Sequence, residues 1–294
     1  MILALIASLR PRQWTKNLLV FAGVLFSRQF GQPQLVMRAV AGFLAFSLLA
    51  GAAYLINDIL DAPADRLHPT KRHRPIAAGR LPVGVAWGAV VPVLGVSILL
   101  GAWLGRDFLA VAGLYLALNV AYNLGLKRQV LLDVFVLAVG FVLRAIAGVA
   151  LLVPVSPGTK LSPWLLVCTF FGALFLGLAK RRREIASPDA GRRRSVLNHY
   201  TPELLDGLLM VTAACSLMGY ALYTIWPATV EKFHTEALLF TVPFVTYGIF
   251  RYLYLVRTSD QTEDPALVLL SDRPIGICVL SYVMLVGLIL YRHV

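Results

Sequence analysis

The sequence has few charged residues, and acidic residues are the scarcer of the two signs. Asp, Glu, Lys and Arg make up 14% of the 294 residues, and only 15 of them are acidic. An average soluble domain has about 25% charged residues. Apolar residues reach 59%, and the mean hydropathy is +0.75. This composition excludes an ordinary water-soluble protein and predicts an integral membrane protein.

Cysteine is almost absent, and long hydrophilic stretches are missing altogether. The three cysteines, Cys168, Cys215 and Cys278, are far apart and lie in apolar runs. Their spacing fits neither a disulfide framework nor a metal site, so we interpret them as packing residues. No low-complexity segment or long polar region separates parts of the chain. We therefore expect a single transmembrane domain over residues 1–294.

Apolar runs dominate the sequence, and their lengths predict the fold class. A helix needs about 20 apolar residues to cross a bilayer. The runs predict an all-α integral membrane protein with about nine transmembrane helices, at residues 16–30, 35–56, 83–104, 107–124, 129–153, 162–179, 203–226, 235–256 and 273–291.

The cations are distributed unevenly between alternate loops. Most of the 27 Lys and Arg residues fall on one set of loops, and the opposite set holds only Arg28, Arg38, Arg106, Lys160, Lys232 and Arg292. The positive-inside rule then predicts a multi-pass protein of the cell membrane, with a cytoplasmic N-terminus and the C-terminus outside. The net charge of +12 indicates membrane lipids and phosphate substrates as partners, and no nucleic acid.

Asn57–Asp65 carries a regular row of acidic residues directly after the second apolar run. Asp58, Asp61 and Asp65 are spaced i, i+3 and i+7, so they share a helical face if the helix continues. Such a cluster repels itself unless a cation is bound. Oxygen ligands of this kind suit Mg²⁺, with Mn²⁺ as an alternative, so the predicted metal ligands are Asn57, Asp58, Asp61 and Asp65.

Cations and tyrosines surround this row in the sequence. They fit a phosphate-binding role, but solvated loops and membrane anchors explain such residues equally well. Near the row and the N-terminus, the candidates are Lys16, Tyr54, Asn57, Lys71, Arg72 and Arg74. Farther along, they are Tyr122, Lys127, Arg128, Arg144, Lys180, Arg181 and Glu184.

Arg144 is an unusual residue for the interior of an apolar run. It follows Asp133 by eleven residues, close to three helical turns, so both fall on nearly one face. A guanidinium is costly in lipid and should face the bundle interior. We expect either a substrate phosphate or a structural ion pair to compensate its charge.

Two motifs resemble those of the UbiA-type polyprenyl transferase superfamily. One is the N-D-x-x-D-x-x-x-D pattern of residues 57–65, at the end of a second membrane helix. The other is R-x-x-R-P-[I/L]-x-x-G, represented by residues 71–79 with Lys71 in place of the first arginine. The resemblance covers essentially the whole chain. It implies a bundle of membrane helices, a Mg²⁺-dependent transferase and an active site on the cytoplasmic side.

One departure from the family pattern narrows the expectation. Members that prenylate aromatic rings carry a second D-x-x-x-D after the sixth span, whereas this chain has Lys180 and Glu184 at the matching positions. With this difference, and with the motifs in residues 10–17 and 122–148, the chain resembles the branch of decaprenyl-phosphate phosphoribosyltransferases. The branch moves phosphoribosyl from phosphoribosyl diphosphate (PRPP) to a polyprenyl phosphate, releasing diphosphate, and supplies precursors of cell-wall arabinan.

The resemblance also implies roles for individual residues. Asp58 and Asp61 would act with the metal on the leaving diphosphate, and Lys127 and Arg144 would position phosphates; we expect these four to be catalytic. The lipid phosphate is already an anion, so no general base is needed.

Two other functions stay open at this point. A prenyltransferase using an isoprenyl diphosphate donor would need acid from elsewhere, such as Glu263, Asp264 and Asp272. A lipid or ion transporter would use buried charges as its path, but we find no inverted repeat. An oligomer is compatible with the sequence.

Overall fold

The structure is a computed structural model that describes residues 1–27, 32–67, 71–186, 195–258 and 271–291. Within these ranges the only regular structure is helical, α-helix with short 3-10 segments. The predicted all-α class is therefore confirmed.

Eight helical segments are long and apolar enough to cross a membrane in the described part of the chain. They are α3 (Pro33–Leu60), α5 (Val83–Leu104), α6 (Arg106–Leu124), α7 (Leu132–Ala150), α8 (Pro163–Glu184), α10 (Pro202–Ile225), α14 (Arg273–Tyr291), and η5 (Ala237–Thr241) joined to α12 (Val242–Thr258). The chain is thus a multi-pass membrane protein, and these segments match eight of the nine predicted runs.

The ninth predicted span, residues 16–30, has a different form. Its described part is the 3-10 helix η1 (Pro11–Phe21) followed by the short α2 (Ala22–Ser27), and residues 28–30 lie outside the described ranges. A C-terminus on the opposite side from the N-terminus requires an odd number of crossings, so η1 and α2 would have to complete the ninth. Nine crossings and this orientation stay predictions.

Close backbone packing fixes α2 against α7. A Cβ atom added at Gly23 would lie 1.9 Å from the carbonyl oxygen of Gly148, and one at Gly148 would lie 2.2 Å from the carbonyl oxygen of Val20. Only glycine fits at both positions, because any side chain would collide with the facing backbone. This contact anchors the N-terminal segment beside the helix that carries Arg144.

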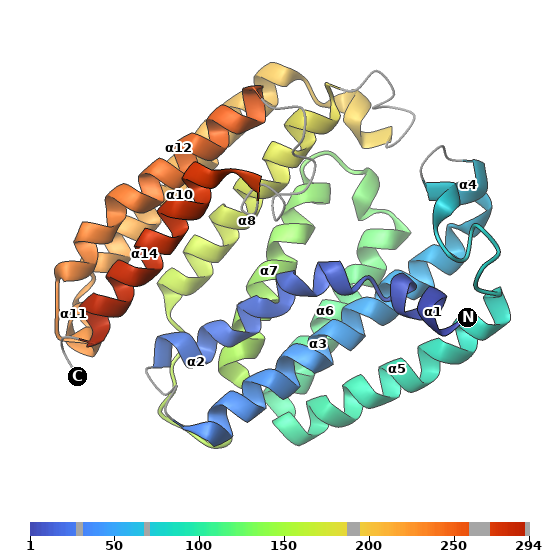
Figure 1. Cartoon of the computed structure of the whole chain (residues 1–294), viewed down its shortest axis with the longest axis horizontal. Coiled ribbons are helices and arrows are strands. Elements are labelled where there is room, and N and C mark those ends of the chain that lie inside the picture. The colour runs from blue at the N-terminus through green and yellow to red at the C-terminus, as the bar shows by residue number, and fades with distance from the viewer. Residues whose placement is uncertain (28–31, 68–70, 187–194, 259–270, 292–294) are drawn as a thin grey trace. The chain divides into compact units, whose positions relative to one another are not determined.

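The chain divides into two compact units, which we describe separately. The first contains residues 1–127 and 139–162, and the second contains residues 128–138 and 163–294. In the first unit α3 packs along α5 and also contacts η1 and α6 (Figure 1). Its core is formed by Phe46, Phe108, Leu143 and Leu151, among others. The expectation of a single domain stays a prediction.

The length of α3 explains why its end is polar. Its 28 residues extend about 42 Å, which exceeds the roughly 30 Å hydrocarbon core. Arg38 and Asn57 are nineteen residues apart, or about 28 Å. Arg38 donates to the carbonyl oxygens of Leu104 and Leu151, at the ends of α5 and α7. We infer that Arg38 and Asn57 mark opposite boundaries of the apolar layer.

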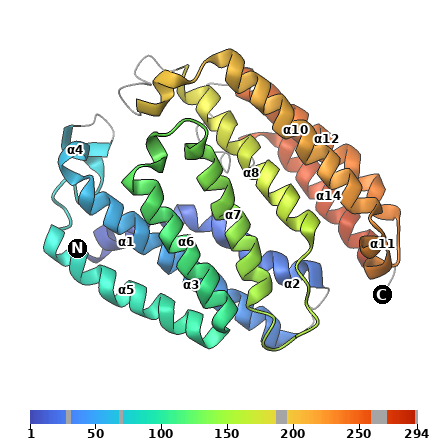
Figure 2. The ribbon, with the colours of Figure 1, turned by 180° about the vertical axis from the view of Figure 1, so that it is seen from behind.

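In the second unit the long helices also pack in pairs. α8 lies along α10, and α12 lies along α14 (Figure 2). Val134, Phe175, Leu178 and Leu205 form part of its core. The other short elements in the described ranges are α1 (Ile2–Ser8), α4 (Ala62–Leu67), η2 (Lys71–His73), η3 (Leu126–Arg128), η4 (Ser195–His199) and α11 (Pro227–Phe233).

Candidate active site

The end of α3 delivers the acidic row into the first unit. α3 stops at Leu60, Asp61 forms its C-cap, and α4 starts at Ala62. Asp65 therefore lies within α4, the short helix that follows the end of α3. Both carboxylates are nearly buried, at 3% relative exposure, whereas the Asp61 side chain is 37% exposed. The row is thus two buried acids and one accessible acid.

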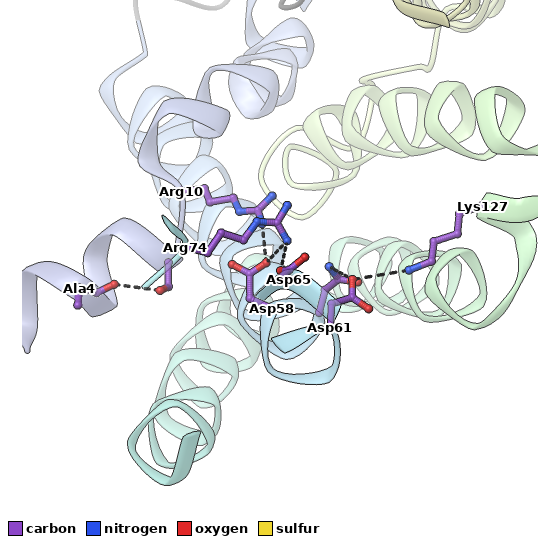
Figure 3. Close-up of polar contacts among 9 residues, drawn as sticks. Ala4, Arg10, Asp58, Asp61, Asp65, Arg74 and Lys127 are labelled. Carbon is purple, nitrogen blue, oxygen red and sulfur yellow. Dashed lines mark hydrogen bonds and ion pairs between the residues drawn. The ribbon is translucent and has the colours of Figure 1, made fainter. Parts of the chain in front are cut away.

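Two arginines neutralise the buried acids. Arg10 Nη2 lies 2.6 Å from Asp58 Oδ1, and Arg74 Nη1 lies 3.0 Å from the same oxygen (Figure 3). The same Arg74 nitrogen lies 2.7 Å from Asp65 Oδ2. The two carboxylates hence share one cationic nitrogen, as the i, i+7 spacing predicts for one face.

Asp61 belongs to a separate set of contacts. Asn57 Nδ2 donates to Asp61 Oδ2 at 3.0 Å, and Lys127 Nζ lies 3.9 Å from that oxygen. Lys127 comes from η3, directly after α6. We call Asp58, Asp61 and Asp65 with Arg10, Arg74 and Lys127 the carboxylate cluster (Figure 3).

The loop after α4 holds Arg74 in place by apolar packing. Ile76 and Leu81, each 1% exposed, pack in one cluster with Leu55 and Ile59 of α3. Backbone hydrogen bonds run from Arg74 N to Lys71 O and from Ala78 N to Arg74 O. The R-P-I-A-A-G stretch therefore forms a rigid turn that directs Arg74 at the carboxylates.

Arg10 is a site residue that sequence reasoning missed. We interpreted the N-terminal cations as anchors, with Lys16 as the candidate ligand. The structure instead directs Arg10 at Asp58, with its guanidinium 4.8 Å from the ring centre of Tyr54. The signal available was its place in the R-P-R-Q-W-T-K-N segment, but nothing in that segment shows which cation points inward.

A second polar group lies deeper in the first unit, around Arg144. Its guanidinium donates to Asn17 Oδ1 at 2.8 Å, to Tyr115 Oη at 2.7 Å and to the Gly140 carbonyl at 2.8 Å. Asn17 in turn donates to Ser47 Oγ. Among the described residues no carboxylate pairs with Arg144, so the buried cation is held by neutral groups. Tyr54 lies within electrostatic range of Arg144, Tyr115, Arg10 and Tyr122.

The other predicted residues of the first unit are more peripheral. Lys71 and Arg72 lie on η2, where Arg72 Nε contacts His73 Nε2 at 3.4 Å. Lys16 lies on η1 and is partly exposed, as is Tyr122 near the end of α6. Both have further interactions in the structure. Their roles as phosphate ligands stay proposals.

Four predicted residues, Arg128, Lys180, Arg181 and Glu184, belong to the second unit. Arg181 is 1% exposed. Its Nε lies 2.7 Å from Asp133 Oδ2, and its Nη1 contacts Glu184. Tyr200 donates to the other Asp133 oxygen at 2.6 Å and accepts from the Leu131 N–H. We call Asp133, Arg181, Glu184 and Tyr200 the closed ion pair.

The closed ion pair differs from what we expected for these residues. Asp133 was a potential partner of Arg144, but eleven residues separate the two by about 16 Å along the helix. Sharing a face therefore does not bring them together. Burial and the hydrogen bond to Asp133 raise the pKa of Tyr200, so the phenol stays protonated. Lys180 is exposed, 3.9 Å from Glu184, and Arg128 is exposed at the end of η3.

The described residues just before α14 do not form a second cluster of acidic side chains. Asp272 pairs with Arg251 at 2.9 Å and accepts from the Ile275 N–H. Glu263 and Asp264 lie outside the described ranges. Cys168, Cys215 and Cys278 are free thiols, as predicted.

The sequence matches the description "UbiA prenyltransferase family" over residues 17–271. The chain belongs to the UbiA prenyltransferase family. It is 38% identical over 299 residues to a decaprenyl-phosphate phosphoribosyltransferase of Corynebacterium glutamicum, covering 98% of this chain and 86% of that protein. A protein of the same name from Mycobacterium tuberculosis is 34% identical, with 98% and 94% covered.

Solved structures agree with this UbiA membership at the level of the fold. A UbiA homolog from Archaeoglobus fulgidus, bound to GPP and Mg²⁺, superimposes with a TM-score of 0.71 at 19% identity. The match covers 98% of this chain and 99% of that one. The predicted UbiA-like bundle is therefore confirmed.

The donor chemistry of the carboxylate cluster suits a divalent cation. Within the described ranges no three acidic, His or Cys side chains are gathered as metal ligands, and Asp61 contacts Asn57 and Lys127 while Asp58 and Asp65 contact Arg74. Yet Asp58 and Asp65 already share one cationic nitrogen, and Asn57 and Asp61 add oxygen donors beside them. Carboxylate and amide oxygens are the ligands that Mg²⁺ prefers. The residues present thus fit the metal once the arginines give way.

Proposed function

We propose that this chain is a membrane transferase that moves the 5-phosphoribosyl group from PRPP to a polyprenyl monophosphate such as decaprenyl phosphate. The observation that carries the proposal is the near full-length similarity to proteins named decaprenyl-phosphate phosphoribosyltransferase. The products are diphosphate and a phosphoribosyl lipid. Such a lipid would feed the synthesis of cell-wall arabinan.

The site's metal would be held by Asn57, Asp58, Asp61 and Asp65. Mg²⁺ is the expected ion and Mn²⁺ the alternative; when bound it would neutralise charge on the departing diphosphate. The chain's own residues then have to hold two polyanions in line. Lys127, beside Asp61, is placed to hold the donor's phosphates.

Arg144 is suited to a phosphate that enters more deeply. Its three printed partners are neutral, so its positive charge is hydrogen-bonded but not balanced by a described carboxylate. An uncompensated buried cation is costly, and an anionic ligand lowers that cost. Lys16, Tyr54, Lys71, Arg72 and Tyr122 would complete the site in this unit, and a phosphate-binding role for Arg128 and Lys180, in the second unit, stays a prediction.

The second acidic motif of aromatic prenyltransferases has no counterpart in α8. Arg181 and Glu184 are tied to Asp133 there, so the end of α8 offers no row of free carboxylates for another metal. This supports a reaction in which a lipid monophosphate is the acceptor, over a reaction in which an isoprenyl diphosphate is the donor. We assign Arg181 and Glu184 a structural role in this proposal, in place of the substrate contact expected from the sequence.

The membrane placement forms part of the proposal. We place the carboxylate cluster on the cytoplasmic face of the cell membrane, where PRPP is made, with the polyprenyl tail in the bilayer. The N-terminus would be cytoplasmic and the C-terminus outside.

A donor competition assay tests the function. Purified protein in liposomes receives polyprenyl phosphate, Mg²⁺ and ³²P-labelled PRPP, and lipid products are separated by thin-layer chromatography. We expect a labelled lipid that requires Mg²⁺ and is unaffected by excess geranyl diphosphate. Transfer from labelled geranyl diphosphate, with none from PRPP, would overturn the proposal in favour of a prenyltransferase. No product from either donor would favour a transporter.

A further inference from the structure

Asp58 is contacted by more positive charge than one carboxylate can balance. Arg10 and Arg74 both contact its Oδ1 atom, at 2.6 and 3.0 Å, so two guanidinium groups converge on one oxygen. Two like charges this close repel each other, and only the neighbouring Asp65 relieves that repulsion through Arg74. The arrangement is stable only while carboxylates are the sole anions nearby.

The charges of the carboxylate cluster balance one another. Asp58, Asp61 and Asp65 face Arg10, Arg74 and Lys127. A divalent cation alone would add positive charge where two arginines already contact the ligand oxygens. A diphosphate alone would add negative charge beside three carboxylates. The two together offset much of each other's charge, and the arginines can turn to the phosphates as the metal takes the carboxylates.

The backbone of Arg10 shows that its direction is imposed by the fold. Arg10 has φ 53° and ψ 61°, in the left-handed region that residues other than glycine seldom occupy. A non-glycine residue in this conformation is strained, and such strain often accompanies a functional position. Trp14, which donates to the Leu9 carbonyl, helps to fix this turn.

The side chain of Arg10 is nevertheless able to move. It is 28% exposed, and it rests on the face of Tyr54 at 4.8 Å. Guanidinium groups bind phosphate in the same bidentate way as carboxylate. Arg10 can therefore exchange Asp58 for a phosphate oxygen without leaving its aromatic platform.

We propose that Arg10, which contacts Asp58, is a donor-phosphate ligand that exchanges Asp58 for the donor, so that the metal and PRPP bind together and not separately. The proposal rests on the proposed function. It assigns Arg10, which the sequence did not single out, to substrate binding. It also gives Arg10 and Arg74 the task of keeping the metal out until the donor arrives.

Metal and donor binding, measured separately on the full chain in nanodiscs, test this proposal. Mn²⁺ binding without donor is followed by electron paramagnetic resonance, and binding of ³²P-labelled PRPP is measured at saturating Mn²⁺. In Arg10→Gln we expect Mn²⁺ alone to bind about tenfold more tightly and PRPP about tenfold more weakly. Changes of opposite sign are the signature, since a merely structural arginine would weaken both. Arg12→Gln, in the same segment but exposed, is the matched control and should change neither.

Each outcome decides between the two proposals. If wild-type protein binds no PRPP with Mn²⁺, the proposed function and this inference both fail. If wild type binds PRPP and Arg10→Gln leaves both affinities unchanged, or lowers both, this inference fails while the function stands. If Arg10→Gln does not fold, Arg10→Lys is measured in its place. It should bind Mn²⁺ alone as tightly as wild type does and bind PRPP more weakly. An unchanged PRPP affinity would overturn the inference.

Discussion

The carboxylate cluster and the closed ion pair are both built from arginine and aspartate, but solvent reaches them differently. In the first, the aspartate Asp58 is buried while the side chains of Arg10 and Arg74 are 28% and 25% exposed. In the second, Arg181 and Asp133 are 2% and 0% exposed. Exposed cations can exchange partners at little cost, whereas separating the buried pair leaves a charge without solvent. The same residue types thus form one exchangeable site and one fixed brace.

Breaking the closed ion pair should have the largest effect on stability. Asp133→Asn removes the carboxylate that lies 2.7 Å from the buried Arg181 Nε, and we expect a loss of about 3 kcal/mol in the free energy of unfolding. Thermal unfolding in detergent checks this. Asp206→Asn is the matched control, because Asp206 pairs with Arg182 at a partly exposed position and should cost no more than about 1 kcal/mol. Equal losses in both variants would show that burial does not distinguish the pairs.

Replacing both members of the pair should restore much of that stability. In the double variant Asp133→Leu with Arg181→Met, no buried charge is left unpaired, and apolar side chains of similar size fill the space. We expect the double variant to unfold within about 2 kcal/mol of wild type. A double variant less stable than Asp133→Asn would mean that the network around Tyr200 needs the charges themselves.

Removing the shared arginine of the carboxylate cluster should affect binding more than stability. Arg74→Gln removes the cation between Asp58 and Asp65, but Arg10 still contacts Asp58 and the glutamine amide can donate a hydrogen bond to the buried Asp65, so we expect a stability loss of about 1 kcal/mol. PRPP affinity should fall about tenfold, which corresponds to about 1.4 kcal/mol. Calorimetry of unfolding and a PRPP filter-binding assay separate the two effects. A large loss of stability with normal PRPP binding would reverse the assignment.

The smallest expected effect concerns Asp272, which forms an ion pair with the partly exposed Arg251. The hydrogen bond from Arg251 lowers the pKa of Asp272 below its ordinary value of 3.8. The carboxylate therefore contributes stability above pH 3.8, and the contribution is lost as the pH falls through the lowered pKa. Asp272→Asn should melt slightly below wild type at pH 7, and the difference should shrink as the pH falls below 3.8. A difference that stays constant as the pH falls would show that the carboxylate's charge is not its source.

The apolar helices could be predicted from the sequence because a run of side chains decides where a helix crosses lipid. The predicted span 83–104 coincides with α5, and the predicted span 35–56 lies within α3. Neither the 3-10 form of η1 nor the close contact between Gly23 and Gly148 could be predicted. Contacts of this kind join residues far apart in the chain.

The candidate site could be predicted only as far as local spacing reaches. The i, i+7 relation predicted that Asp58 and Asp65 share a face, and both contact Arg74, whereas their role as metal ligands stays a prediction. Arg10 is 48 residues from Asp58, and Asp133 is 48 residues from Arg181. Neither pairing leaves a periodic trace in the sequence, so one arginine was overlooked as a site residue and another was expected to bind substrate.

Phosphoribosyl transfer by Asp61→Asn tests the central claim most directly. Asp61 is the exposed acid of the carboxylate cluster, so its replacement leaves no buried charge unpaired. In liposomes with saturating Mg²⁺, PRPP and polyprenyl phosphate, we predict a rate lowered at least about a hundredfold, with an unchanged melting temperature. Asp206→Asn should retain the wild-type rate. An Asp61→Asn rate within twofold of wild type would contradict the assignment of the carboxylate cluster as the active site.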